Sequence, residues 1–176
     1  MTENRLYLKR PDAGDEARVV EYRDEHFSVG DFTINGGAGL ANAKSFGEWL
    51  ARSERNGCEE TVMPGLVPES TFLAIRAEDD RMVGVINVRH RLNDFLLNFG
   101  GHIGYGIRPS ERGRGYATEM LALALGECRR LGMERVLLTC DRDNPASAKV
   151  MRKNGAVLEN EVDEDGVIVQ RYWIDL

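Results

Sequence analysis

Apolar and β-forming residues gather in short segments between polar turns, a pattern that predicts strands. The expected strands cover residues 5–10, 71–77, 82–90, 102–108, 135–140, 156–161 and 167–174. Apolar residues three and four positions apart predict helices over residues 12–26, 45–54 and 117–131. A fourth, shorter helix is expected from Pro145 to the Asn154-Gly155 stop.

The helix over residues 117–131 has the clearest apolar stripe. We expect the following residues to face the core: Ala117, Met120, Leu121, Ala124, Leu125, Cys128 and Leu131. In the helix over 12–26 the expected inward residues are Ala13, Ala17 and Val20, and in that over 45–54 they are Phe46, Trp49 and Leu50.

The run Arg112-Gly113-Arg114-Gly115-Tyr116-Ala117 lies between a strand and the strongest helix. A helix start has unpaired N–H groups and a partial positive charge, which together favour an anion such as a pyrophosphate. The two glycines let backbone approach that anion, and the two arginines add charge-assisted donors. An ordinary tight turn between strand and helix, with solvated arginine side chains, would account for the same run of residues.

The spacing excludes two common phosphate loops, Gly-x-x-x-x-Gly-Lys-Ser/Thr and Gly-x-Gly-x-x-Gly. It fits Arg-x-x-Gly-x-Ala. Downstream, Asn144-Pro145-Ala146-Ser147 begins a short helix that ends at Lys153-Asn154-Gly155. Asn144 can cap this helix whatever else it does.

Together these motifs resemble the acetyl-CoA loop and the second signature of the GNAT N-acetyltransferase superfamily, over about a hundred residues from Phe72 to the C-terminus. Three stretches, residues 83–90, 100–105 and 171–174, resemble a subgroup of uncharacterised predicted acetyltransferases. The resemblance implies an α+β fold with a central mixed, mostly antiparallel twisted sheet of six to seven strands flanked by helices. It implies one domain over 1–176, with an acceptor-side region at 1–70 and an acetyl-CoA-binding core at 71–176.

The resemblance also implies the ligand and the residues that bind it. The co-substrate is acetyl-CoA, with no metal. The implied cofactor-binding residues are Tyr105, Ile107, Arg112, Gly113, Arg114, Gly115, Tyr116, Ala117, Thr118, Asn144 and Ser147. Tyr105 and Ile107 would contribute backbone amides, so the identity of their side chains matters little for binding.

Acyl transfer to an amine needs a proton acceptor, a donor to the carbonyl oxygen and a proton for the leaving thiolate. His102 is the first candidate for the base because histidine titrates near neutral pH, and His90 is the reserve. Either histidine could instead be a buried structural residue. Family members often have a tyrosine acid four residues after the motif serine, but that position is Met151 here. Tyr105, Tyr172 or water would then donate the proton, or the thiolate would leave without a proton donor.

Composition narrows the alternatives. The chain has 176 residues, 42% of them hydrophobic and 30% charged, which is typical of one soluble globular domain. Its net charge of −6 disfavours nucleic acid and fits a cationic amine better. It contains no apolar run long enough for a membrane span and no apolar leader, so we expect a cytoplasmic protein. Three separated cysteines argue against disulfides and zinc.

Three classes of function remain open. The first is an N-acetyltransferase acting on a primary amine of a small molecule, with peptide or protein N-termini as a variant. The second is a non-catalytic acyl-CoA sensor, and the third is another phosphate binder that only resembles the family. A homodimer through the C-terminal hairpin is a further hypothesis, because an uncovered strand edge invites pairing.

Overall fold

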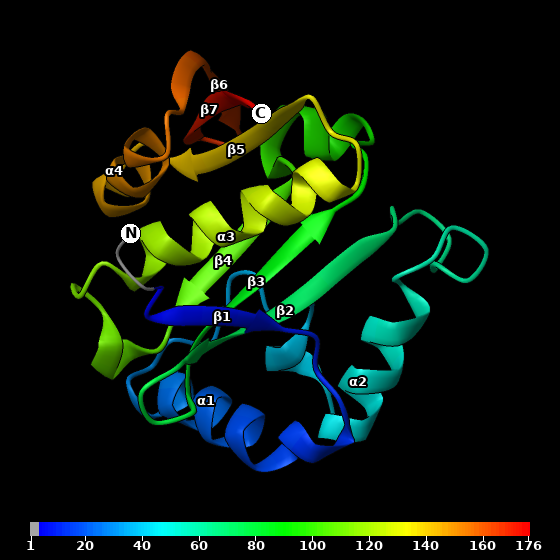
Figure 1. The fold of residues 1–176 in the computed structure, drawn as a ribbon. Coiled ribbons are helices and arrows are strands. Elements are labelled where there is room, and N and C mark those ends of the chain that lie inside the picture. Colours follow the sequence, from blue (N-terminus) through cyan, green and yellow to red (C-terminus); the bar gives the residue numbers. More distant parts are fainter. Residues whose placement is uncertain (1–3) are drawn as a thin grey trace.

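The computed structural model describes residues 4–176, and Figure 1 shows its elements. The strands are β1 (Leu6–Lys9), β2 (Glu69–Arg76), β3 (Arg81–Arg89), β4 (Ile103–Ile107), β5 (Arg135–Asp141), β6 (Val157–Glu164) and β7 (Val167–Asp175). The α-helices are α1 (Glu16–Ser28), α2 (Phe46–Arg55), α3 (Tyr116–Arg130) and α4 (Pro145–Lys153). Short helical turns are η1 (Ala13–Asp15), η2 (Leu40–Asn42), η3 (Leu96–Gly100) and η4 (Pro109–Glu111).

The strands form two sheets, with orders β1-β2-β3-β4 and β5-β7-β6, and every strand pairing in them is antiparallel. The mixed α+β prediction is confirmed, but the single central sheet is divided in two between β4 and β5. Figure 1 shows these two strands running in the same direction. They meet at the start of β4, where the His102 amide donates to the Leu137 carbonyl over 2.7 Å.

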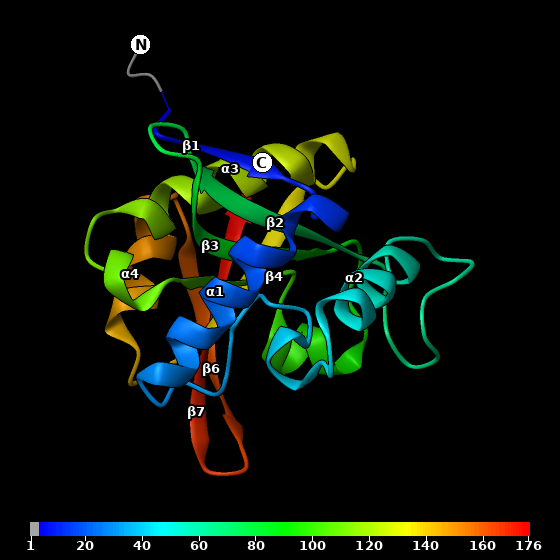
Figure 2. The same ribbon diagram turned by 90° about the horizontal axis from the view of Figure 1, so that it is seen from below.

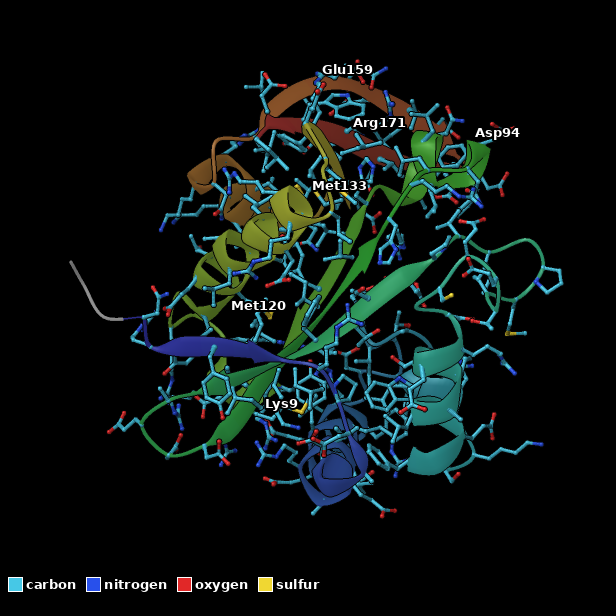
Figure 3. The ribbon with its side chains drawn as sticks, turned by 45° about the vertical axis from the view of Figure 1, so that its right-hand side comes forward. Lys9, Asp94, Met120, Met133, Glu159 and Arg171 are labelled. Carbon is cyan, nitrogen blue, oxygen red and sulfur yellow. The ribbon has the colours of Figure 1, made fainter. Side chains whose placement is uncertain are left out.

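Helices cover both faces of the first sheet. Figures 1 and 2 show α3 and α4 on one face, with α1 and α2 on the other face of the first sheet. A large apolar cluster lies under α3, and it includes Met120, which points toward the sheet in Figure 3. A smaller cluster around Trp49 and Leu73 lies under α1 and α2. The expected stripe of α3 is buried at Met120, Leu121, Ala124, Leu125 and Cys128, whereas Leu131 at the helix end is 44% exposed.

The inward face of α1 differs from the prediction. Ala13 and Ala17 are exposed, and the buried residues of the helix are Val19, Tyr22 and His26. Val20, the third predicted residue, is partly buried and packs against the smaller apolar cluster. Two of the three buried residues carry polar groups, so apolar periodicity alone does not mark them. Helix α2 buries Phe46 and Trp49 as predicted, with Ser45 as its N-cap.

The π-helical turn η3 between β3 and β4 was not predicted. Distant side chains bind its carbonyl groups: Arg89 donates to Gly100 over 3.1 Å, Arg171 to Leu97 over 2.9 Å and Thr139 to Phe99 over 2.7 Å. Figure 3 shows Arg171 on β7 beside Glu159 and near the segment of Asp94. Strands from both sheets therefore hold this turn in place.

Three further findings concern the strand edge at β6, the thiols and the apolar length of the helices. Strand β6 is an outer edge of its sheet and exposes Val157 and Leu158, so homodimer formation there stays a prediction. Cys128 and Cys140 are buried free thiols and Cys58 is an exposed one. In the part of the chain that the structure describes, no helix is long and apolar enough to cross a membrane.

Candidate active site

The start of α3 presents a row of unpaired backbone amides. Gly113 and Gly115 both adopt positive φ angles, 78° and 83°, which turn the chain sharply into the helix. The Glu119 amide donates to the Gly115 carbonyl. Within residues 4–176, no acceptor is recorded for the N–H groups of residues 113–118. We name this row, residues 113–118, the amide cradle.

Arginines surround the amide cradle, each held by a carboxylate. Arg112 donates to Asp31 over 2.8 Å and to the Ile107 carbonyl over 3.1 Å, and Arg114 lies 3.4 Å from Glu111. Both side chains remain about half exposed. Arg112 therefore ties the loop to the end of β4 and still presents charge to solvent.

Arg5 is a neighbour that the sequence did not indicate. It donates to the Arg114 carbonyl over 3.2 Å, pairs with Glu119 over 3.0 Å and lies over the Tyr116 ring. The Tyr116 side chain is buried and accepts a hydrogen bond from Arg76, so it anchors the helix rather than facing the cradle. Thr118 accepts a bond through its carbonyl from the Asn154 side chain, which links the first turn of α3 to the end of α4.

The amides of Tyr105 and Ile107 face away from β3. The Arg89 amide donates to His102 and the Arg108 amide donates to Val83, so the even-numbered residues of β4 bond to β3. Alternation along a strand then directs the amides of Tyr105 and Ile107 toward β5. No register shift occurs between β3 and β4. Since β5 pairs with β7 and not with β4, these amides line the gap between the sheets.

The Tyr105 side chain crosses this gap to α4. Its hydroxyl lies 2.7 Å from the Ser147 Oγ in the first turn of α4. Burial raises the pKa of Tyr105 to about 12, against the opposing effect of the Ser147 hydrogen bond. The hydroxyl is therefore protonated at neutral pH and can donate.

Asn144 caps α4, as its position in the sequence indicated. Its side chain accepts from the Ser147 amide over 3.1 Å, and it is exposed at the β5–α4 turn. The structure thus brings Tyr105, Ser147 and Asn144 together at one side of the gap. Met151, which stands where the family tyrosine is expected, is 1% exposed and lies in the core.

His102 lies where the two sheets meet, and its geometry argues against a role as general base. The Leu137 amide donates to His102 Nδ1 over 2.9 Å. A neutral imidazole then carries its proton on Nε2, so it has no free lone pair to accept another. Burial and the Arg89 charge lower the pKa of His102 to about 4. The side chain is suited to joining β4 to β5.

The other two histidines are also engaged. His90 Nε2 lies 2.8 Å from Ser70 Oγ, and burial followed by the Arg10 charge lowers its pKa. His26 is 1% exposed and its Nδ1 lies 3.0 Å from Asp31. Asp31 in turn pairs with Arg112, so this buried histidine supports the cradle arginine.

The face of β4 opposite Tyr105 is closely covered. A Cβ on Gly36 would lie 2.5 Å from the Gly104 carbonyl oxygen, and one on Gly106 would lie 2.7 Å from the Asn35 carbonyl oxygen. The glycines of β4 thus allow the connection between α1 and α2 to approach its backbone. Their alternation with Tyr105 was the available signal, but the partner segment could not be named from sequence.

Comparison with known proteins gives a family match. The model of the acetyltransferase (GNAT) domain family matches residues 5–157. No curated protein sequence is similar enough to count as a relative.

Several solved structures share the fold. The RimL ribosomal L7/L12 alpha-N-protein acetyltransferase in complex with coenzyme A has a TM-score of 0.71 and 18% identity, covering 100% of this chain and 97% of that one. The microcin C7 self-immunity acetyltransferase MccE, in complex with acetyl-CoA and AMP, has a TM-score of 0.71 and 16% identity, covering 99% and 94%. A dodecameric spermidine N-acetyltransferase from Vibrio cholerae has a TM-score of 0.66 and 16% identity, covering 98% and 95%.

Proposed function

The chain belongs to the GNAT acetyltransferase family, and from this premise we propose that it moves an acetyl group from acetyl-CoA to the primary amine of a small molecule by direct transfer. The observation that carries the proposal is the amide cradle, which follows β4 at the end where β4 and β5 are not paired. Unpaired helix amides are a general site for phosphate groups. The neighbouring gap would take the extended arm of the cofactor.

The residues of the cradle have separate roles in this proposal. The amides of residues 113–118 bind the pyrophosphate, and the exposed guanidinium groups of Arg112 and Arg114 add charge at its flanks. Tyr105 and Ile107 offer backbone amides to the arm and to the acetyl carbonyl oxygen. Asn144 and Ser147 border the arm from α4.

The transfer step needs no further reagent. The neutral amine nitrogen forms a bond to the acetyl carbon, the carbon–sulfur bond breaks, and the amine loses one proton while the thiolate gains one. An amide pointing at the carbonyl oxygen stabilises the negative charge that develops there.

We assign proton donation to Tyr105 and proton removal to solvent water. The Tyr105 hydroxyl is protonated, buried and held by Ser147 on the side of the gap where the thiolate would leave. His102 is given no proton-accepting role because Leu137 occupies its lone pair.

A second candidate is acetylation of a peptide or protein N-terminus, which the likeness to the RimL structure favours. A third is a non-catalytic acyl-CoA sensor. The first two candidates differ in the acceptor, and the third lacks the transfer step, but all three would use the cradle and the gap to bind the acyl-CoA.

Calorimetric titration tests the cofactor first. Acetyl-CoA and free CoA are expected to bind, with no response to ATP or NAD in the same salt. Binding of ATP or NAD but of neither CoA species would reject the proposal.

Release of the CoA thiol then tests catalysis. Small primary amines are expected to release it from acetyl-CoA. Release with peptides alone would favour the second candidate, and cofactor binding without any release would favour the sensor.

A further inference from the structure

Arg89 at the end of β3 lies on the face of the first sheet that carries α1 and α2. Its cross-strand neighbours are His102, directly before β4, and Glu69 on β2. One terminal nitrogen, Nη1, donates to the carbonyls of Gly100 and Gly101 over 3.1 and 3.2 Å. No hydrogen bond is recorded for Nη2 within residues 4–176. Half of the guanidinium is therefore left for another acceptor.

This arginine also lacks a carboxylate partner. Among the described residues, no Asp or Glu oxygen lies within 4.0 Å of it. Arg76, Arg108 and Arg171, by contrast, each pair with at least one carboxylate, at 2.9 Å or closer. An acidic neighbour, Glu69 on β2, is the Cα partner of Arg89; burial lowers the pKa of Arg89, and the charge of Glu69 raises it. Glu69 makes no direct ion pair with Arg89, so a ligand that brings a carboxylate to bonding distance would stabilise the part-buried charge further.

The free nitrogen is close to the reaction region. Nη2 lies 3.5 Å from the point where a Gly104 Cβ would stand, beside Gly36 of the α1–α2 connection. Gly104 directly precedes Tyr105, whose amide we have assigned to the acetyl carbonyl. Tyr105 projects toward α4, whereas Arg89 lies on the opposite face, against the α1–α2 connection that covers Gly104. An acceptor held at the margin of this connection would meet Arg89 one residue from the Tyr105 amide.

We propose that Arg89 binds a carboxylate of the acceptor, so that the substrate is a primary amine bearing a carboxylate, such as an amino acid. The inference rests on the proposed acetyl transfer and adds the class of its substrate. A guanidinium is suited to this because its planar donors match the two oxygens of a carboxylate. The net charge of −6 is compatible with such an acceptor, because the chain attracts its ammonium end while Arg89 binds its carboxylate.

The test compares acceptors that differ in the carboxylate alone. Initial rates are measured at saturating acetyl-CoA for β-alanine against β-alaninamide and for 4-aminobutanoate against 4-aminobutanamide, with the concentration of neutral amine matched in each pair. The carboxylates are expected to exceed their amides by about tenfold or more in kcat/KM, as a charge-assisted hydrogen bond permits. Arg89→Gln should reduce the carboxylates to the level of the amides, and Arg89→Lys should retain part of the preference.

Arg171→Gln is the matched control. Arg171 also donates to a carbonyl of η3 but is paired with Glu159, so its loss loosens the turn without removing the proposed subsite. It should leave the carboxylate preference unchanged. Equal rates for each acid and amide in the wild type, or equal losses for both in Arg89→Gln, would overturn the inference.

The wild-type comparison holds even where a variant fails to fold. Acetyl transfer without a carboxylate preference rejects this inference alone. If acetyl-CoA binds and no amine of any kind releases thiol, the proposed function itself fails.

Discussion

Tyr105 contributes to the site in two ways that depend on different atoms. Its backbone amide faces the gap because of strand alternation, whereas its hydroxyl reaches Ser147 because the side chain crosses to α4. The first was predictable from position along a strand. The second required the place of α4, which the sequence did not specify.

The hydroxyl can be tested separately from the amide with Tyr105→Phe. We expect kcat to fall by about a hundredfold or less, the lower end of general acid catalysis, because a thiolate is already a good leaving group. The KM for acetyl-CoA should change little, since the backbone amide remains. Steady-state kinetics measure both values.

Ser147→Ala is the control for this variant. It removes the partner of the hydroxyl and leaves the donor itself, so kcat should fall less than in Tyr105→Phe. An unchanged kcat in Tyr105→Phe would assign the proton to water and leave Tyr105 with its amide alone.

At the scale of elements, the sequence predicted best where one pattern determined the structure. Helix α3 has a continuous apolar stripe, and the glycines before it have the positive φ angles that a sharp turn requires. Helix α4 starts at its predicted cap, Asn144. These features are local, so neighbouring residues alone determine them.

The elements that were missed depend on distant contacts. The turn η3 is held by Arg89, Arg171 and Thr139, which come from three different strands. The buried face of α1 was missed in part because it includes His26, whose Nδ1 lies beside Asp31. No local pattern indicates such partners, and this is also why His102 looked free to act as a base.

The amide cradle gives a prediction at this scale, through Gly113. The φ angle of 78° there is one that Asn and Asp tolerate better than other residues, and a Cβ would meet nothing within 4 Å. Gly113→Asp and Gly113→Asn should therefore bear the same backbone strain. The aspartate should weaken acetyl-CoA binding by tenfold or more relative to the asparagine, because a carboxylate among the amides repels phosphate.

Calorimetry in low and high salt measures this difference. Screening by salt should narrow it. Equal affinities of the two variants at low salt would show that the pyrophosphate does not bind at the amide cradle.

At the scale of the whole molecule, the backbones of the two sheets are joined at the start of β4. His102 both donates to Leu137 through its amide and accepts from Leu137 through Nδ1. Farther along β4 the amides are left for a ligand. We therefore infer that His102 acts as a positioning residue that holds β4 against β5.

Substitution of His102 separates positioning from catalysis. His102→Asn keeps an acceptor near the place of Nδ1 but provides no base, whereas His102→Leu leaves the buried Leu137 amide unpaired, at a cost of about 1–3 kcal/mol. We expect the asparagine variant to retain most of kcat with an unchanged pH profile, and the leucine variant to lose both stability and activity. If both variants lost the same limb of the pH profile of kcat, His102 would be the general base after all.

The same residue should make the fold sensitive to acid. His102 titrates at about 4 when folded and near 6.5 when unfolded, so between these values the unfolded chain binds a proton that the folded chain does not. Stability is therefore lost as the pH falls from 6.5 toward 4, by roughly 3 kcal/mol from this group. Asparagine does not titrate, so denaturant unfolding of His102→Asn should show a shallower loss than the wild type over this range. If the wild type and His102→Asn lost stability in parallel as the pH falls, His102 would titrate near its ordinary pKa. The contact between His102 and Leu137 would then not hold in solution.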